Sequence, residues 1–315
     1  MPKIAITDYF TEDSVEREIL GDLVGIGPDS DTEVLLVWHE HINEAYIRQF
    51  PKVKAVQRYG VGYDTLDLPF LLSNGIRCCN NPDYGTDEVA DTAVAMIMNI
   101  ARGISQYNHL AKGYFADWQE NINPLVKRNS ETVVGVIGSG RIGGSVVLKC
   151  NALKFKTVIF DPFKERGHEK MLGTKRVDSI EELLEISDII SLHAPLNSKT
   201  KGMVDEHFIA NMKPGASLVN TARGGLVKNL DILLEGLLSG KLNQVALDVL
   251  VHEPPQSEPL IDAWRANHPE IAGRLTINPH TSYYSQESYL ELRRNAAKNA
   301  LRLLEGKEAY NILSE

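Results

Sequence analysis

The chain has 315 residues, of which 24% are charged and 43% hydrophobic, a composition typical of folded proteins rather than disordered or fibrous ones. At about 150 residues per domain, this length favours two domains. The formal net charge of −9, without a block of lysine or arginine, argues against direct binding to nucleic acid or to an anionic membrane surface.

The beginning of the chain lacks the charged segment and apolar core of a secretion signal, and no stretch reaches the roughly 18 apolar residues of a membrane span. Cys78, Cys79 and Cys150 have neither the spacing of a metal site nor the number of a disulfide framework. We therefore expect a cytoplasmic protein with reduced thiols, no metal and no membrane anchor.

Short apolar runs alternate with helical patterns along the first hundred residues, which is typical of βαβ units and parallel sheets. The predicted strands there are 3–7, 34–38, 55–58 and 77–79. The predicted helices are 12–20, 43–49 and 68–73. A longer helical pattern then runs from residue 87 to about residue 107.

A second series of strands is predicted at 132–138, 157–160, 188–193, 217–220, 245–249 and 275–278, followed by a helix over 286–306. Strands alternating with helices in this way indicate a doubly wound sheet. We predict an α/β fold with two doubly wound parallel-sheet domains. A Rossmann domain, residues 102–289, is inserted into a flavodoxin-like domain made from residues 1–101 and 290–315.

The strand at 132–138 runs directly into a GxGxxG motif. Gly138 permits a tight turn, Gly140 lets the backbone approach a pyrophosphate, and Gly143 lets the following helix pack closely on the strand. Asp161 ends the next strand, 18 residues after the last glycine, where its carboxylate can accept hydrogen bonds from ribose hydroxyls. Because this carboxylate would repel a 2′-phosphate, the motif favours NAD, with NADP as the second choice.

Three further side chains follow predicted strands of the same domain: Arg223, Glu253 and His280. The planar fork of an arginine can hold a carboxylate with two hydrogen bonds. A glutamate beside a histidine favours the protonated ring and keeps a proton available near neutral pH. Singly, such residues are more often surface charges or packing groups, but together they fit a dehydrogenase that acts on 2-oxo acids.

Several motifs, in this order, resemble the D-isomer-specific 2-hydroxyacid dehydrogenase family over about four-fifths of the chain. They are Arg58–Asp64, the glycine motif, His193–Leu196 with Thr200, Asn220–Gly225, Asp248-Val249 with Glu253-Pro254, and Pro279-His280. Residues 219–227 and 284–293 most closely resemble the C-terminal-binding-protein branch, whose members are NAD-binding transcriptional corepressors that retain the dehydrogenase residues.

The resemblance implies an NAD-dependent enzyme that interconverts a small 2-oxo acid and a D-2-hydroxy acid by hydride transfer. It implies that Arg223 binds the substrate, that His280 is the acid/base and that Glu253 tunes it. Backbone N–H groups of Val61 and Gly62 would complete the carboxylate site as the two domains close. The implied cofactor-binding residues are Gly138, Gly140, Arg141, Ile142, Gly143, Asp161, His193, Ala194, Pro195, Thr200, Thr221, Ala222 and Asp248.

The identity of the substrate stays open at this stage. Tyr283 is a further expected substrate contact, and it stands where the corepressor branch typically has tryptophan, which makes the pocket more polar. The family also implies a homodimer. The alternative function is an NAD(H)-sensing, corepressor-like binding protein with weak dehydrogenase activity.

Overall fold

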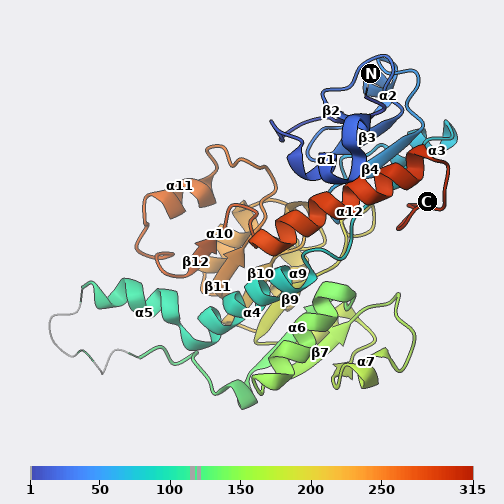
Figure 1. The fold of residues 1–315 in the computed structure, drawn as a ribbon. Coiled ribbons are helices and arrows are strands. Elements are labelled where there is room, and N and C mark those ends of the chain that lie inside the picture. The colour runs from blue at the N-terminus through green and yellow to red at the C-terminus, as the bar shows by residue number, and fades with distance from the viewer. Residues whose placement is uncertain (1, 114–117, 119–121, 315) are drawn as a thin grey trace. The chain divides into compact units, whose positions relative to one another are not determined.

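The computed structural model describes residues 2–113, 118 and 122–314. Within this part of the chain the elements form two compact units (Figure 1). Unit 1 comprises Met1–Thr86 and Tyr283–Glu315, and unit 2 comprises Asp87–Ser282. Unit 2 is therefore inserted into unit 1. Both boundaries lie earlier in the chain than the predicted ones at 101/102 and 289/290.

Unit 1 contains, among the described residues, a five-stranded parallel sheet in the order β2-β1-β3-β4-β5, which is the flavodoxin-like order. Its strands are β1 (Ile4–Ile6), β2 (Val24–Ile26), β3 (Val34–Val37), β4 (Ala55–Arg58) and β5 (Arg77–Cys79). Its helices are α1 (Ser14–Leu20), α2 (Glu44–Ile47), α3 (Leu68–Ser73) and α12 (Gln286–Leu304), with a 3₁₀ turn at Gly21–Leu23. Strand β2 is absent from the sequence prediction.

Helices cover both faces of this sheet because successive strand residues point to opposite sides. In β3, Val34 and Leu36 share one apolar cluster with α1 and α12. Leu35 and Val37 share another cluster with α2 and α3. The long helix α12 packs against α1, β3 and β4, all within unit 1. The strands β1 and β3 are short and wholly apolar, which is why the apolar runs of the sequence predict them.

Unit 2 contains, among its described residues, a seven-stranded parallel sheet in the order β12-β11-β10-β9-β6-β7-β8, a Rossmann arrangement with one added edge strand. Its strands are β6 (Val133–Ile137), β7 (Lys156–Phe160), β8 (Lys175–Arg176), β9 (Ile189–Leu192), β10 (Ala216–Asn220), β11 (Leu242–Leu247) and β12 (Leu275–Ile277). The two-residue strand β8 is absent from the sequence prediction. The two parallel sheets confirm the predicted α/β fold class.

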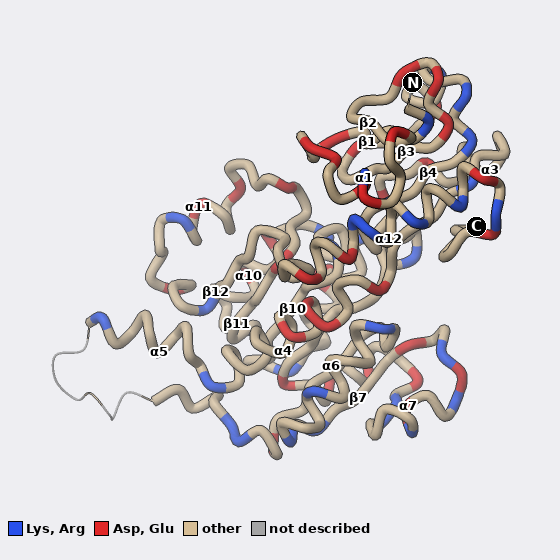
Figure 2. The backbone as a smooth tube through the Cα atoms, in the orientation of Figure 1, with Lys and Arg blue, Asp and Glu red and all other residues tan. Residues whose placement is uncertain are grey.

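The helices of unit 2 form two layers around this sheet. They are α4 (Thr86–Arg102), α5 (Ile104–Ala111), α6 (Arg141–Ala152), α7 (His168–Met171), α8 (Ile180–Ile186), α9 (Glu206–Asn211), α10 (Asp231–Leu238) and α11 (Pro259–Arg265), with 3₁₀ turns at Asn129–Glu131 and Gly224–Leu226. Helices α4 and α6 pack on one face, and α8 to α11 pack on the other. Figure 2 shows acidic and basic residues interspersed along the chain, while β6, β9, β10 and β11 carry none.

Packing explains both unit boundaries. Ala93 and Ile97 of α4 share a cluster with Val134 and Val136 of β6, so this helix belongs to unit 2. At the other boundary the ring of Tyr283 packs in the main cluster of unit 1. The helix predicted to reach about residue 107 is in fact two helices, because Gly103 adopts a left-handed conformation with φ +63° that ends α4.

A buried ion pair joins α1 to α12 in the core of unit 1. The guanidinium of Arg293, which is only 2% exposed, donates from Nε to Glu16 Oε1 at 2.8 Å and also contacts Glu12. Tyr59 donates its hydroxyl hydrogen to the same Glu16 oxygen at 2.8 Å. The hydrogen bond from Arg293 lowers the pKa of Glu12 to about 2. The charges are thus mutually neutralised where solvent cannot screen them.

We expect Glu16→Gln to lower the free energy of unfolding by about 3 kcal/mol, because only Glu12 would then neutralise the buried Arg293. Urea denaturation measures the loss. Glu18→Gln is the matched control: Glu18 pairs with Arg294 at 3.2 Å on the surface, where a pair contributes less than about 1 kcal/mol. Equal losses in the two variants would contradict the assignment of the buried pair to the core of unit 1.

Candidate functional site

The three glycines of the motif after β6 occupy three different environments. Gly138 has φ +87°, and a Cβ there would lie 2.8 Å from the backbone nitrogen of Ala194. A Cβ on Gly143 would lie 2.0 Å from the carbonyl oxygen of Gly138, so α6 can pack on the turn only without a side chain at this position. A Cβ on Gly140 would meet nothing within 4 Å. The open side of the loop is therefore at Gly140.

The N-terminus of α6 adjoins this open side. Gly140, its capping residue, has no side chain to accept a hydrogen bond from the first turn, which begins with Arg141 and Ile142. Unpaired N–H groups and the partial positive charge of a 12-residue helix favour an anion at such a position. The geometry of the loop thus fits the pyrophosphate that its sequence predicts.

Asp161, at the end of β7, is tied to the glycine loop. Its Oδ2 accepts hydrogen bonds from the backbone nitrogen of Ser139 at 2.8 Å and from the Ser139 hydroxyl at 3.2 Å, while Oδ1 accepts from the backbone nitrogen of Phe163 at 3.0 Å. A carboxylate has about four acceptor positions, so capacity for ribose hydroxyls is left. The link to Ser139 could not be predicted from the sequence, because a motif does not show which side chains and backbone groups pair with each other.

His193 follows β9 and lies against the same loop. A Cβ on Gly143 would approach the His193 Cβ to 3.1 Å, and the ring Nε2 is 2.8 Å from the hydroxyl oxygen of Ser191. Burial lowers the pKa of His193 to about 4, so its ring is neutral near pH 7. Farther along, the predicted cofactor residue Thr200 donates its hydroxyl hydrogen to the carbonyl oxygen of Pro195 at 2.6 Å and closes its own loop.

The predicted catalytic residues Glu253 and His280 lie together at the carboxyl edge of the sheet. Glu253 Oε2 is 2.7 Å from His280 Nδ1, and Glu253 Oε1 accepts a hydrogen bond from the backbone nitrogen of Leu250 at 2.7 Å. Burial tends to raise the pKa of Glu253, but the hydrogen bond and charge of His280, together with the Leu250 N–H and Arg223, lower it overall. Glu253 is therefore held as a carboxylate against the imidazole ring.

Arg223 follows β10 on a turn built for close packing. The side chain of Asn220 accepts a hydrogen bond from the backbone nitrogen of Ala222 at 3.0 Å and donates to the carbonyl oxygen of Arg223 at 2.9 Å. A Cβ on Gly224 would lie 1.8 Å from the carbonyl oxygen of Leu250. Only glycine therefore lets the Arg223 turn lie against the segment that leads to Glu253.

Asp248 holds the turn that carries His280. Asp248 is 2% exposed, and its carboxylate accepts hydrogen bonds from the backbone nitrogens of Thr281 at 3.0 Å and Ser282 at 3.1 Å. The backbone carbonyl oxygen of Asp248 accepts a hydrogen bond from the backbone nitrogen of His280 at 2.8 Å. These bonds stabilise His280 at φ +55°, a conformation that is costly for a residue with a side chain. The cofactor contact expected for Asp248 stays a prediction, and the structure adds hydrogen bonds that position the histidine turn.

Two buried hydroxyl groups near these residues have no hydrogen-bond partner among the described residues: Thr221 Oγ1 and Ser282 Oγ. Unsatisfied buried polar atoms are unusual in folded proteins and commonly mark a position where a ligand or water binds. Thr221 is one of the predicted cofactor-binding residues.

The predicted substrate residues Val61, Gly62 and Tyr283 belong to unit 1. Val61 O accepts a hydrogen bond from Asn80 Nδ2 at 2.6 Å, and Gly60 O accepts from the backbone nitrogen of Asn81 at 3.1 Å. Within the described part of the chain, the backbone N–H groups of Val61 and Gly62 donate to no acceptor. These two donors are thus available to an anion.

Tyr283 lies in an aromatic cluster of unit 1. Its ring centroid is 5.9 Å from that of Trp38 and 6.2 Å from that of Tyr84, and both pairs are edge-to-face. Burial, with neighbouring tyrosines, raises the pKa of Tyr283, so its hydroxyl group stays neutral. Val61 packs on the same cluster, which places aromatic groups next to the two available N–H donors.

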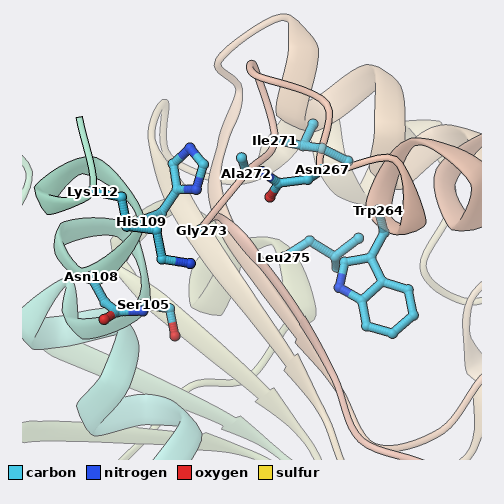
Figure 3. A pocket seen from close by; sticks show the side chains of 10 residues that line it. All are labelled: Ser105, Asn108, His109, Lys112, Trp264, Asn267, Ile271, Ala272, Gly273 and Leu275. Atoms are coloured by element: carbon cyan, nitrogen blue, oxygen red, sulfur yellow. The ribbon is translucent and has the colours of Figure 1, made fainter.

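A separate pocket of about 200 Å³ lies elsewhere in unit 2 (Figure 3). His109 of α5 and Lys112, which follows this helix, face Trp264, Asn267 and Ala272 across it. None of the predicted site residues lines this pocket.

In the described residues, no group of three or more His, Cys, Asp or Glu side chains is placed to hold a metal ion. In the same residues, no helix is long and apolar enough to cross a membrane.

Residues 94–282 match the model of the D-isomer specific 2-hydroxyacid dehydrogenase NAD-binding domain. The chain belongs to this family. It is 30% identical, over 325 aligned positions, to D-3-phosphoglycerate dehydrogenase of Methanocaldococcus jannaschii, covering 100% of this chain and 60% of that protein. It is 28% identical to C-terminal-binding protein 1 of Caenorhabditis elegans, covering 96% and 40% of the two chains. The chain thus spans only part of the length of these two relatives.

The solved structure of D-lactate dehydrogenase from Aquifex aeolicus, complexed with NAD and lactic acid, resembles this family member with a TM-score of 0.84. The two sequences are 27% identical, and the similarity covers 96% of each chain. The family match covers the whole glycine motif and the segments of Arg223, Glu253 and His280. The comparisons therefore support the sequence-based resemblance to the dehydrogenase family, and C-terminal-binding protein 1 is among the similar proteins.

We expect Gly143→Ala to change the stability of the protein and Gly140→Ala to change its affinity for NADH. Gly143→Ala forces a Cβ against a carbonyl oxygen and should lower the free energy of unfolding by about 1–3 kcal/mol or more. Gly140→Ala meets no protein atom, so stability should change by less than about 0.5 kcal/mol, but NADH should bind more weakly. Thermal unfolding and fluorescence titration with NADH measure the two effects. Wild-type NADH affinity in Gly140→Ala would show that the pyrophosphate does not lie there.

Proposed function

We propose that this chain is an NAD-dependent oxidoreductase that interconverts a small 2-oxo acid and a D-2-hydroxy acid. The observation that carries the proposal is the 2.7 Å contact between Glu253 and His280, at the sheet edge that also carries the glycine motif. A histidine backed by a carboxylate can hold a proton and transfer it to or from a substrate oxygen near neutral pH. Nδ1 faces Glu253, which leaves Nε2 as the nitrogen that exchanges the proton.

Arg223 supplies the positive charge that this chemistry needs. Gly224, next to it, packs on Leu250, whose N–H binds Glu253, so the two segments lie side by side, and Arg223 Nη1 donates to the carbonyl oxygen of Ala222 at 2.8 Å. A guanidinium carries five N–H donors, so it can also bind a substrate carboxylate and polarise the carbonyl oxygen. We assign Arg223 to substrate binding and His280 to acid/base catalysis, with Glu253 orienting the ring.

The residues of unit 2 fit NAD. The open side at Gly140 and the uncapped first turn of α6 would hold the pyrophosphate, Asp161 the ribose, and the unpartnered Thr221 hydroxyl the nicotinamide end. When bound, NAD supplies the hydride acceptor, and in its reduced form the hydride donor. The neutral, buried ring of His193 adds no charge to this surface.

In unit 1, we assign the free N–H groups of Val61 and Gly62 to the carboxylate of the substrate. Two N–H donors converging on one anion act without a counter-charge and without conformational change. The aromatic cluster that includes Tyr283 lies next to these donors. Its rings are apolar, and its tyrosines add polar hydroxyl groups.

We further propose that the protein is a cytoplasmic homodimer. Helix α5 has no buried residue, and Ile104 and Leu110 are exposed on it, as are Ile122 and Leu125 after it. Exposed apolar side chains on a helix that buries none of its residues commonly mark an interface. The free, buried thiols of Cys78, Cys79 and Cys150 fit a reducing compartment. A single monomeric species in sedimentation velocity would overturn the dimer, and recovery outside the cytosolic fraction would overturn the location.

The proposed reaction is tested by NADH oxidation with a panel of 2-oxo acids that includes glyoxylate, hydroxypyruvate, pyruvate, phenylpyruvate and branched-chain members. NADPH, measured in parallel, tests the cofactor preference. Turnover supports the proposal and names the substrate class. Tight NADH binding without turnover on any member would favour the alternative of an NAD(H)-sensing binding protein, which the similarity to C-terminal-binding protein 1 keeps open.

We expect His280→Ala and Arg223→Ala each to lower kcat about 10²- to 10⁴-fold and to leave the Kd for NADH unchanged, since neither side chain is assigned to the cofactor. His252→Ala is the matched control: His252 also faces a glutamate, Glu258, at 3.3 Å, but is exposed and outside the proposed site. Near-normal turnover in either active-site variant, or an equal loss in His252→Ala, would overturn the assigned roles.

A further inference from the structure

The two free N–H groups in unit 1 owe their direction to asparagines that follow β5. In a trans peptide the C=O and N–H groups point in opposite directions. The carbonyl of Val61 and the N–H of Gly62 belong to one peptide group, and Asn80 Nδ2 binds that carbonyl at 2.6 Å. The carbonyl of Gly60 and the N–H of Val61 belong to the preceding group, and the Asn81 N–H binds that carbonyl at 3.1 Å. Anchoring each oxygen therefore turns each N–H the other way.

The sheet places these anchors correctly. Strands β4 and β5 are parallel neighbours with Gln57 paired to Cys79, so residue 80 comes directly beside the start of the 58–62 segment. Asn80 is 8% exposed and Asn81 is 4% exposed. The side chain of Asn81 is itself fixed, because its Nδ2 donates to the carbonyl oxygen of Leu292 in α12 at 3.0 Å. Both anchors are thus part of the core of unit 1.

The peptide between Val61 and Gly62 needs such an anchor. Gly62 lies on one side of it, and glycine gives the backbone access to conformations in which a peptide group can turn over. A reversed 61–62 peptide would present a carbonyl oxygen where the N–H now lies, and that oxygen would repel a carboxylate. The hydrogen bond from Asn80 opposes this reversal, since breaking it would leave a buried amide donor unpaired.

We propose that Asn80 is a positioning residue of the substrate site: its side-chain amide fixes the 61–62 peptide so that the Gly62 N–H receives the substrate carboxylate. This inference rests on the proposed function of the chain. Asn80 itself is not required to touch the substrate. Its effect is on carboxylate binding and not on NAD binding or on proton transfer at His280.

The test compares Asn80→Asp with the wild type in the full chain loaded with NADH. The new carboxylate is close in shape to the amide but cannot donate to the Val61 oxygen when ionised. We expect the Kd for oxamate, a carboxylate analogue of pyruvate, to rise about 10- to 100-fold, which is the usual worth of a hydrogen bond to a charged group. The Kd for NADH should not change.

Acidification provides a signature that a purely structural role would not give. When the introduced carboxyl group becomes protonated, its O–H can donate to the Val61 oxygen again. The ratio of the variant's oxamate Kd to that of the wild type should therefore fall between about pH 7 and about pH 5. Asn80→Ala removes the donor without adding charge, should weaken oxamate binding at every pH, and replaces Asn80→Asp if that variant does not fold.

Asn299→Asp is the matched control. Asn299 is also a buried asparagine of unit 1, 4% exposed, whose Nδ2 donates to Gln57 Oε1 at 2.6 Å and to the Tyr310 carbonyl oxygen at 2.9 Å, but it does not touch residues 60–62. Its oxamate Kd should equal that of the wild type even if its thermal stability falls.

The outcomes separate the two proposals. Wild-type oxamate affinity in the Asn80 variants, or equal weakening in Asn299→Asp, overturns the role of Asn80 and leaves the enzyme assignment standing if 2-oxo acids are turned over. Oxamate binding that depends on Asn80, without turnover of any 2-oxo acid, overturns only the proposed reaction. A wild-type chain that binds no oxamate overturns both.

Discussion

In unit 2, the residues that follow β6, β9 and β11 each donate a backbone N–H to the carbonyl oxygen of the last residue of a neighbouring strand. Gly138 donates to Phe160, His193 to Ile137, and Asp248 to Asn220. Each of these hydrogen bonds fixes the first residue of a loop to the sheet, one residue beyond the end of its strand. This constraint brings segments that are far apart in sequence to one edge, where the glycine motif, the Arg223 turn and the histidine turn begin from fixed backbone atoms.

One costly backbone conformation and one close backbone contact lie at this edge. His280 adopts a left-handed conformation, and Gly224 tolerates a contact that a side chain would prevent. Each is stabilised by a neighbour: Asp248 binds the histidine turn through three backbone nitrogens, and Asn220 closes the arginine turn on both sides. In unit 1, Asn80 and Asn81 act similarly on residues 60–62. Side chains that bind backbone, rather than ligand, thus determine where the proposed catalytic groups point.

The sequence predicted the parallel sheets, the glycine motif and the contact between Glu253 and His280 because these depend on local patterns and on strand ends meeting at one edge. It did not predict β2 or β8, which have only three and two residues and no distinct apolar run. It extended α4 past Gly103, since one glycine within a helical pattern does not by itself show a left-handed φ. It assigned Asp161 and Asp248 to ligands and missed their protein partners, because pairing between side chains and distant backbone is a three-dimensional property. Asn80 and Asn81 left a weak signal, as two adjacent polar residues directly after a buried strand.

The link between Asp161 and Ser139 bears on how cofactor preference can change in this protein. The carboxylate that would discriminate against a 2′-phosphate also holds the backbone of the phosphate-binding loop. Replacing Asp161 by a neutral or basic residue would remove the repulsion of a 2′-phosphate but would also break the hydrogen bond to the loop. Cofactor selectivity and loop rigidity therefore depend on the same side chain. An exchange of NAD for NADP therefore calls for a second change that restores an acceptor for the Ser139 N–H. Selection acting on one property at this position is constrained by the other, and a single substitution is a poor route between the two cofactors.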